Sequence, residues 1–335
     1  MRQSTGSGAW GISHLRGAVL AFVVAGATAL GSGVVSAEPV EFRPPDVPMY
    51  ASPPQPDHLA AAWYQKSHPN AVPSGTNDFT CVPSAAHPHP VVLAHGTDSS
   101  AYSDWSGIAP RLTAAGFCVF ALNYGGKPGA ESYGTEDLVL SAYQVGAFVD
   151  QVLAATRADK VDLVGFSQGA NVTRYYVNKL GGAPKVDQWV GLASPTYGGV
   201  MYGLVPVAQA IPGALQAFAA VTSLAAVQQA EGSPIMLDLN AGGDTVPGVR
   251  YVTIGSRVDE MIQPFENIAL RGPGARNIAL QDLCPVDLTG HFHMVYDPFV
   301  QELLLTVLDP GSPAPVCREV PLGTGIPEVI IAGNS

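Results

Sequence analysis

Near the middle of the chain stands the sequence Lys160-Val161-Asp162-Leu163-Val164-Gly165-Phe166-Ser167-Gln168-Gly169. It consists of a charged residue, a short apolar run and the pattern Gly-x-Ser-x-Gly. A serine at a sharp turn between a strand and a helix takes a strained backbone conformation, which lifts its hydroxyl above the sheet. The glycines two residues before and after it leave room, because side chains there would clash in so tight a turn. The pattern predicts a nucleophile at Ser167; the alternative is an ordinary turn serine in a glycine-rich loop.

The sequence around this motif predicts strands that alternate with helices. Apolar runs typical of buried strands occur at residues 90–94, 117–122, 161–164, 186–192, 250–254 and 277–280. Apolar residues recur at helical spacing over residues 105–115 and 138–152, and residues 298–308 resemble a closing helix. Continuous apolar strands that alternate with helices indicate a parallel sheet covered on both faces. The predicted fold class is therefore α/β, with one main domain.

The first 37 of the 335 residues differ from the rest. Arg2 and Arg16 precede an apolar run over residues 18–30, and the segment ends in Val35-Ser36-Ala37. This is typical of a secretory signal cleaved after Ala37, although residues 17–37 are also long enough for an uncleaved membrane anchor. We expect four parts: a signal peptide at 1–37, a proline-rich arm at 38–80, the main domain at 81–318 and a tail at 319–335.

The remaining chain is strongly acidic. Removal of residues 1–37 takes away two arginines and no acidic residue, so 14 basic residues oppose 27 acidic ones and the net charge becomes −13. A chain this acidic, without a basic run, is a poor candidate for binding nucleic acid or anionic membrane surfaces. We expect an extracellular protein that has no nucleic-acid partner and no stable membrane span in its mature form.

Four cysteines remain after residue 37: Cys81, Cys118, Cys284 and Cys317. An even number in an exported chain suggests two disulfides, for which three pairings are possible. The pairs Cys81–Cys118 and Cys284–Cys317 are favoured because each closes a modest loop within one region of the chain. Such loops are worth roughly 3–4 kcal/mol each in the chain-entropy model. A zinc site is the alternative, but no Cys-x-x-Cys spacing occurs, so no metal is expected.

A serine nucleophile needs a base, and the base needs an acid that orients it. In serine hydrolases built on parallel sheets the three follow in the order Ser, Asp or Glu, His. Only His291 and His293 lie downstream of Ser167, and both precede the closing helix. If the chain has a base, it is one of these two.

Asp259 is the favoured acid because it follows the apolar strand at 250–254, at the carboxyl end where sites on parallel sheets are built. Glu260, Asp282 and Asp287 are the alternatives. For each of these residues the non-catalytic alternative is an ordinary solvated carboxylate in a loop.

Acyl transfer also requires donors for the developing oxyanion, worth on the order of 3–4 kcal/mol each. The backbone N–H of Gln168 and that of Thr97, in the loop after the first strand, are the candidates. His95, directly after the same strand, is expected to be structural.

Two segments outside the main pattern carry further expectations. Glu38–Pro73 contains nine prolines, which predicts an extended arm pinned by Trp63 and Tyr64. Gly198–Ala230 has no charged residue. It is interpreted either as buried helices or as an apolar cap or acyl-binding wall over the site.

Five segments resemble secreted actinobacterial lipases of the class 2 (Bacillus-type) lipase family: residues 91–97, 121–125, 161–169, 239–248 and 280–285. The similarity extends from about Cys81 to Pro310. It implies an α/β-hydrolase fold and hydrolysis of carboxylic esters, often acylglycerols, with Ser167, Asp259 and His291 as the triad. Phe166 replaces the usual histidine of the nucleophile motif, and the loop around His291 differs from the usual pattern, so His293 stays an alternative.

The sequence thus predicts a secreted esterase or lipase that requires no cofactor and acts on an ester or acylglycerol, with a lipid–water interface as a possible setting. A short-chain carboxylesterase, an envelope acyltransferase and a non-catalytic lipid-binding hydrolase fold are the alternatives.

Overall fold

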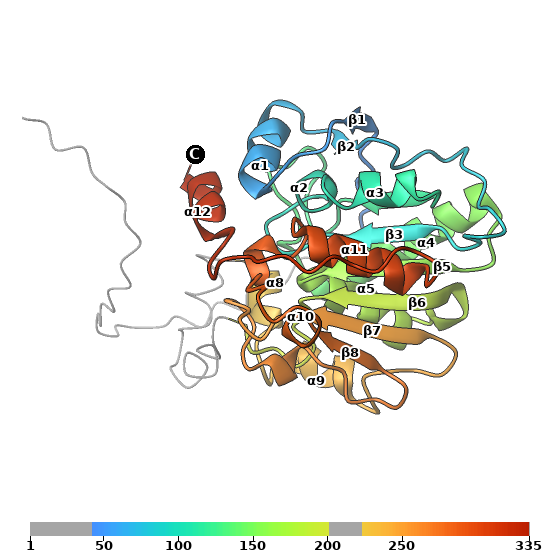
Figure 1. Cartoon of the computed structure of the whole chain (residues 1–335). Coiled ribbons are helices and arrows are strands. Elements are labelled where there is room, and N and C mark those ends of the chain that lie inside the picture. The colour runs from blue at the N-terminus through green and yellow to red at the C-terminus, as the bar shows by residue number, and fades with distance from the viewer. Residues whose placement is uncertain (1–41, 201–222, 335) are drawn as a thin grey trace, which may run out of the picture. The chain divides into compact units, whose positions relative to one another are not determined.

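The computed structural model describes residues 42–200 and 223–334 (Figure 1). The expected signal peptide at 1–37 lies outside the described residues. So does most of the expected apolar cap, of which only residues 198–200 and 223–230 are described.

A six-stranded parallel sheet forms the centre of the described chain, in the order β4-β3-β5-β6-β7-β8 (Figure 1). Its strands are β3 (Val91–Ala94), β4 (Val119–Leu122), β5 (Val161–Phe166), β6 (Val186–Leu192), β7 (Arg250–Gly255) and β8 (Arg276–Ala279). All six match expected strands to within two residues at each end, because each is a short apolar run.

Helices connect these strands and continue beyond them. They are α2 (Ala101–Trp105), α3 (Ala109–Ala114), α4 (Leu138–Thr156), α5 (Gln168–Lys179), α8 (Leu224–Gln228), α9 (Pro234–Asn240), α10 (Leu280–Leu283) and α11 (Pro298–Leu308). Short 3-10 turns occur at η1 (Ala183–Lys185), η3 (Phe265–Asn267) and η4 (His291–His293). Within the range 105–115, where helical spacing was expected, the structure forms α3, whereas α2 ends at Trp105. Pro110 lies in the first turn of α3, where its missing N–H costs no helical hydrogen bond.

The two faces of the sheet bury separate apolar layers. Val91 and Leu93 of β3 pack in one layer, with residues of α2, α3 and α11. Val92 and Ala94 point to the opposite face and pack with residues of α4 and α5. This alternation follows from the two-residue period of a strand and produces the three-layer α/β arrangement.

One helix of the described residues, α4, is long and apolar enough to cross a membrane by length and composition alone. Its buried residues include Leu138, Val145, Phe148 and Val152, which belong to the core beneath the sheet. This packing identifies α4 as a core helix.

The proline-rich segment is not extended throughout, which corrects the expectation. Strands β1 (Tyr50–Ser52) and β2 (Ala71–Pro73) pair in parallel, and helix α1 (His58–Ser67) lies between them in the chain. Residues 58–67 lack proline, and Asp57 caps the helix by accepting the backbone N–H of Ala60 at 2.8 Å. Tyr64 packs against the core, whereas Trp63 is half exposed.

The expected C-terminal tail contains a further helix, α12 (Ile326–Asn334), which packs against α1 and η4. The cysteines form two disulfides, Cys81–Cys118 and Cys284–Cys317, the pairing favoured by the sequence. Both disulfides close loops within one region of the fold.

Candidate active site

Ser167 lies between the end of β5 and the first residue of α5. Its φ of 51° and ψ of −120° are a strained combination for a residue with a side chain. A Cβ on Gly165 would come within 2.4 Å of the backbone nitrogen of Ala170, and one on Gly169 within 2.1 Å of the carbonyl oxygen of Ala94. The two glycines are therefore required by the close approach of backbone on either side of Ser167.

His291 lies in η4, and its imidazole is within hydrogen-bond distance of two side chains. Nε2 is 3.0 Å from Oγ of Ser167, and Nδ1 is 3.0 Å from Oδ2 of Asp259. Because an ionised carboxylate only accepts, Nδ1 donates to Asp259 and Nε2 is left to accept the hydroxyl proton of Ser167. The arrangement suits a serine nucleophile with its base and orienting acid.

Asp259 is held in place by the backbone that follows β7. Its side chain is buried, and Oδ1 accepts the N–H groups of Met261 at 2.9 Å and Ile262 at 2.8 Å. The second oxygen is thereby directed at His291. Burial alone would lower the pKa of His291, but the charge and hydrogen bond of Asp259 and the charges of Glu260 and Asp104 raise it on balance.

The alternative acids and the alternative base lie elsewhere. Glu260 accepts the backbone N–H of His291 rather than its ring. Asp282 is exposed and pairs with Arg257, and Asp287 accepts the backbone N–H of Thr289. Nε2 of His293 is 3.9 Å from Oδ2 of Asp297, at the start of α11.

Ser167 opens into a pocket of about 390 Å³. The pocket is lined by His58, Gly96, Thr97, Asp98, Ser99, Asp104, Phe166, Ser167, Val200, Ala226, Gln229, Met261, Ile262, His291, Phe292 and Val329. Gln168, as the first residue of α5, has a backbone N–H without a partner in its own helix. Its side-chain Oε1 accepts the hydroxyl of Thr97 at 2.7 Å. Thr97 and Gln168, the two residues expected to supply the oxyanion donors, are thus in contact through their side chains, and Thr97 lines the same pocket as Ser167.

His95 is structural in its contacts, as expected. Its ring stacks on Tyr124 with centroids 4.2 Å apart, and Nδ1 lies 2.8 Å from the carbonyl oxygen of Gly96. Burial lowers the pKa of His95 to about 4, so the ring is neutral near pH 7. Phe166, which departs from the family motif, packs with its ring centroid 5.1 Å from that of His291.

The pocket also contains residues that the sequence did not indicate. Asp104, in α2, is buried, and its Oδ2 accepts the N–H of Gly96 at 2.7 Å. Burial raises the pKa of Asp104 to about 6. Nδ1 of His58, in α1, is 3.7 Å from Oδ1 of Asp104, and burial with the nearby His291 and His293 lowers the pKa of His58 to about 3. Val329 reaches the same pocket from α12.

Two triacylglycerol lipases are similar to part of this chain. A triacylglycerol lipase from Pseudarthrobacter phenanthrenivorans is 40% identical over 96 residues, which are 27% of this chain and 28% of that protein. A triacylglycerol lipase from Burkholderia plantarii is also 40% identical over 96 residues, covering 27% of this chain and 25% of that protein. The matches thus span little more than a quarter of each relative.

Solved structures share the fold. Aspergillus fumigatus lipase B aligns with a TM-score of 0.55 and 21% identity, over 70% of this chain and 56% of that chain. The mature form of Bacillus licheniformis lipase BlEst2 aligns with a TM-score of 0.51 and 18% identity, over 68% and 94%. The fold is that of the α/β-hydrolases. The model of the family described as lipase (class 2) matches residues 88–301, which is more than half of the chain, so the chain belongs to the class 2 lipase family.

Proposed function

We propose that this chain is an ester hydrolase that acts on acylglycerols through an acyl-enzyme on Ser167. The observation that carries the proposal is the position of His291, whose two ring nitrogens each lie 3.0 Å from their partners on Ser167 and Asp259. Family membership and the triacylglycerol lipases among the similar proteins support the substrate class.

In the proposed mechanism, His291 takes the hydroxyl proton as Oγ of Ser167 attacks the ester carbonyl. The negative charge on the carbonyl oxygen is stabilised by the N–H groups of Thr97 and Gln168. His291 then passes its proton to the leaving alcohol, and the acyl group stays on Ser167. Water, deprotonated by the same imidazole, releases the fatty acid. The charge of Asp259 stabilises the imidazolium in both steps.

The walls of the pocket support an apolar acyl group. Phe166, Ile262, Phe292 and Val329 line it together with Val200, and Gln229 lies near Thr97. Apolar walls around a few placed polar groups are typical of sites for small hydrophobic ligands.

We also propose that the protein is secreted, with a signal peptide at 1–37, an arm at 38–80, the hydrolase domain at 81–318 and a tail at 319–335. The two disulfides support an oxidising compartment.

The test is hydrolysis of p-nitrophenyl esters from acetate to palmitate by the disulfide-intact chain and by Ser167→Ala. We expect the variant to lose at least about 10³-fold in kcat/KM, as removal of a triad serine does. His293→Gln is the matched control and should retain activity. The chain-length optimum separates a lipase from a short-chain esterase.

Other outcomes contradict the proposal. Activity that survives in Ser167→Ala would place the nucleophile elsewhere. Preferential ester formation with an added alcohol would indicate an acyltransferase, and no activity in either protein would indicate a non-catalytic lipid-binding role.

A further inference from the structure

Three side chains meet at the amino ends of three adjacent strands, β3, β5 and β6, which is the end of the sheet opposite Ser167. His89 precedes β3, Asp162 is the second residue of β5, and Asp187 is the second residue of β6. One potential ligand atom from each lies within 4.8 Å of the other two, the one such group among residues 42–200 and 223–334. Ser167 follows the far end of β5, five residues on, which is about 16 Å along a strand.

Asp162 presents an unsatisfied oxygen to this cluster. The residue is 4% exposed, and its Oδ1 has no hydrogen-bond partner. Nδ1 of His89 lies 4.0 Å from this oxygen, which is too long for a hydrogen bond. Since buried carboxylate oxygens are normally satisfied, an oxygen of this kind points to a missing partner.

The charges present do not supply that partner. Asp187 lies 3.5 Å from His89 and is paired with Arg250, whose guanidinium contacts Oδ2 of Asp187. Asp162 therefore remains buried beside Asp187 without an ion pair of the kind that Arg250 gives Asp187.

We propose that His89, Asp162 and Asp187 bind one divalent transition-metal ion of the zinc class, with water completing its coordination. One imidazole nitrogen and two carboxylate oxygens form a donor set that suits zinc, whereas calcium and magnesium prefer oxygen ligands alone. Metal–ligand bonds of about 2.1 Å in tetrahedral geometry place donor atoms ~3.4 Å apart. The 3.5 Å pair fits this spacing, and the 4.0 Å pair requires a small closure.

Arg250 competes with a bound metal ion for the carboxylate of Asp187. Its side chain is 59% exposed, so it is free to turn toward solvent when Asp187 becomes a metal ligand. The bound ion would join β3, β5 and β6 at their amino ends, away from Ser167. It would therefore raise thermal stability and leave ester hydrolysis unchanged.

The experiment titrates zinc into the chelator-treated full chain by calorimetry and follows the thermal midpoint. We expect one equivalent to bind and the Tm to rise with zinc concentration. Asp162→Asn and His89→Gln should each abolish this equivalent and the Tm increase. His87→Gln, two residues from His89, is the matched control and should bind like the wild type. Arg250→Gln should bind more tightly.

The variant His291→Ala distinguishes the proposed site from zinc binding at the active site. It should still bind one equivalent of zinc. If Asp162→Asn does not fold, the partly exposed His89→Gln decides alone. Wild-type chain that binds no zinc at about 100-fold molar excess, or His89→Gln that binds like the wild type, would overturn the proposal. In that case the cluster is held by the contacts of His89 and Arg250 with the two aspartates.

Discussion

The backbone conformation of Ser167 depends on the absence of side chains at Gly165 and Gly169. Gly169 faces the carbonyl of Ala94 so closely that an added Cβ would lie 2.1 Å away. The backbone of β3 cannot move aside without disturbing the sheet.

We expect Gly169→Ala to lower the free energy of unfolding by at least ~2–3 kcal/mol, because overpacking at a rigid backbone contact is relieved only by distortion. Urea unfolding measures the effect. Gly311→Ala is the control, since its Cβ would meet only the side chain of Asp309. Equal stability of Gly169→Ala and the wild type would show that the turn tolerates a side chain.

A second prediction concerns the acid limb of the pH profile. The proposed base must be neutral, and the charge of Glu260 contributes to raising the pKa of His291. Glu260→Gln removes this charge while retaining an acceptor for the backbone N–H of His291. Because the imidazole then loses its proton more readily, the acid limb of kcat/KM should move to lower pH.

The control for this shift is Asp282→Asn, whose carboxylate is exposed and paired with Arg257. It should leave the limb in place. A limb that stays fixed or moves upward in Glu260→Gln would mean that His291 does not set the acid limb.

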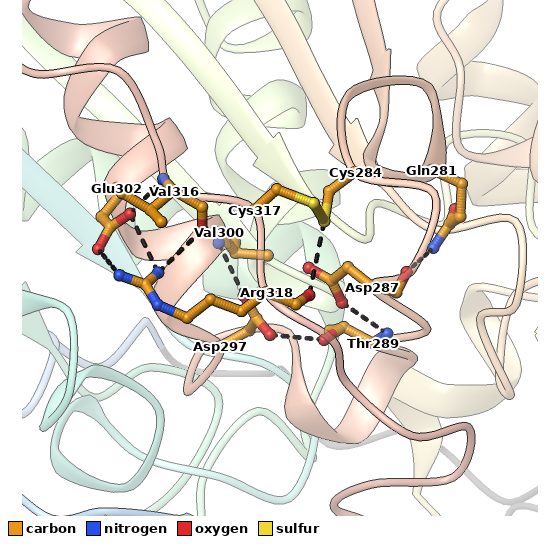
Figure 2. Close-up of a disulfide and its surroundings, with 10 residues drawn as sticks. All are labelled: Gln281, Cys284, Asp287, Thr289, Asp297, Val300, Glu302, Val316, Cys317 and Arg318. Atoms are coloured by element: carbon orange, nitrogen blue, oxygen red, sulfur yellow. Dashed lines mark hydrogen bonds and ion pairs between the residues drawn. A yellow bond between two sulfur atoms is a disulfide. The ribbon is translucent and has the colours of Figure 1, made fainter.

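Figure 2 shows the disulfide Cys284–Cys317. The chain segment that it closes, residues 284–317, includes His291. Thr289 donates two hydrogen bonds in this segment. Its backbone N–H donates to Asp287, and its hydroxyl donates to Asp297 at 2.7 Å. Figure 2 shows Arg318, beside Cys317, reaching Glu302 of α11. The bond and these contacts together fix the loop between α10 and α11.

We expect Cys284→Ala with Cys317→Ala to lose roughly 3–4 kcal/mol of unfolding free energy, from the loop-closure entropy of a 33-residue separation. The kcat should fall as well. Cys81→Ala with Cys118→Ala is the matched control, because its separation of 37 residues is similar but it does not enclose His291. Comparable loss of kcat in both double variants would contradict a local effect on His291.

Helix α12 forms part of the pocket wall. Val329 lines the pocket, and a Cβ on Gly325 would lie 2.8 Å from the backbone of Phe292, so the chain entering α12 rests on η4. Deletion of residues 325–335 should raise KM for p-nitrophenyl butyrate about tenfold, because one wall of the site is lost and each 1.4 kcal/mol of binding is a factor of ten.

Labelling of Ser167 by an organophosphonate shows whether the remaining site is intact in the truncated chain. Unchanged KM and full labelling would show that α12 is not part of the substrate site.

The elements differ in how far their sequence determines them. The sheet and α11 were predictable because buried strands and amphipathic helices carry a local period. The turn at Ser167 was predictable because only glycine fits beside it. His58 and Val329 were not predictable, since they lie more than 100 residues from Ser167 and reach the pocket only through tertiary packing. The helix α1 was missed because flanking prolines obscured a capped ten-residue run.

On the scale of the whole molecule, negative charge is the dominant feature. Residues 38–335 carry a net charge of −13. We expect hydrolysis of an acylglycerol dispersed in phosphatidylglycerol vesicles to be about tenfold slower at low salt than in phosphatidylcholine vesicles, because like charges oppose encounter.

About 0.5 M salt should remove most of this difference, since it shortens the Debye length to a few ångströms. Soluble p-nitrophenyl acetate is the control and should be hydrolysed at the same rate with either lipid. Faster hydrolysis on the anionic vesicles would show that a local cationic surface outweighs the net charge.

The pocket draws its walls from both ends of the described chain, with His58 in α1 and Val329 in α12. A ribosome releases these segments at widely separated times, so a nascent polypeptide that already contains Ser167 still lacks its last wall. Helix α12 can pack only after the residues that precede it have emerged. The part of the pocket wall that Val329 provides is therefore added only after Ser167, Asp259 and His291 have all been synthesised.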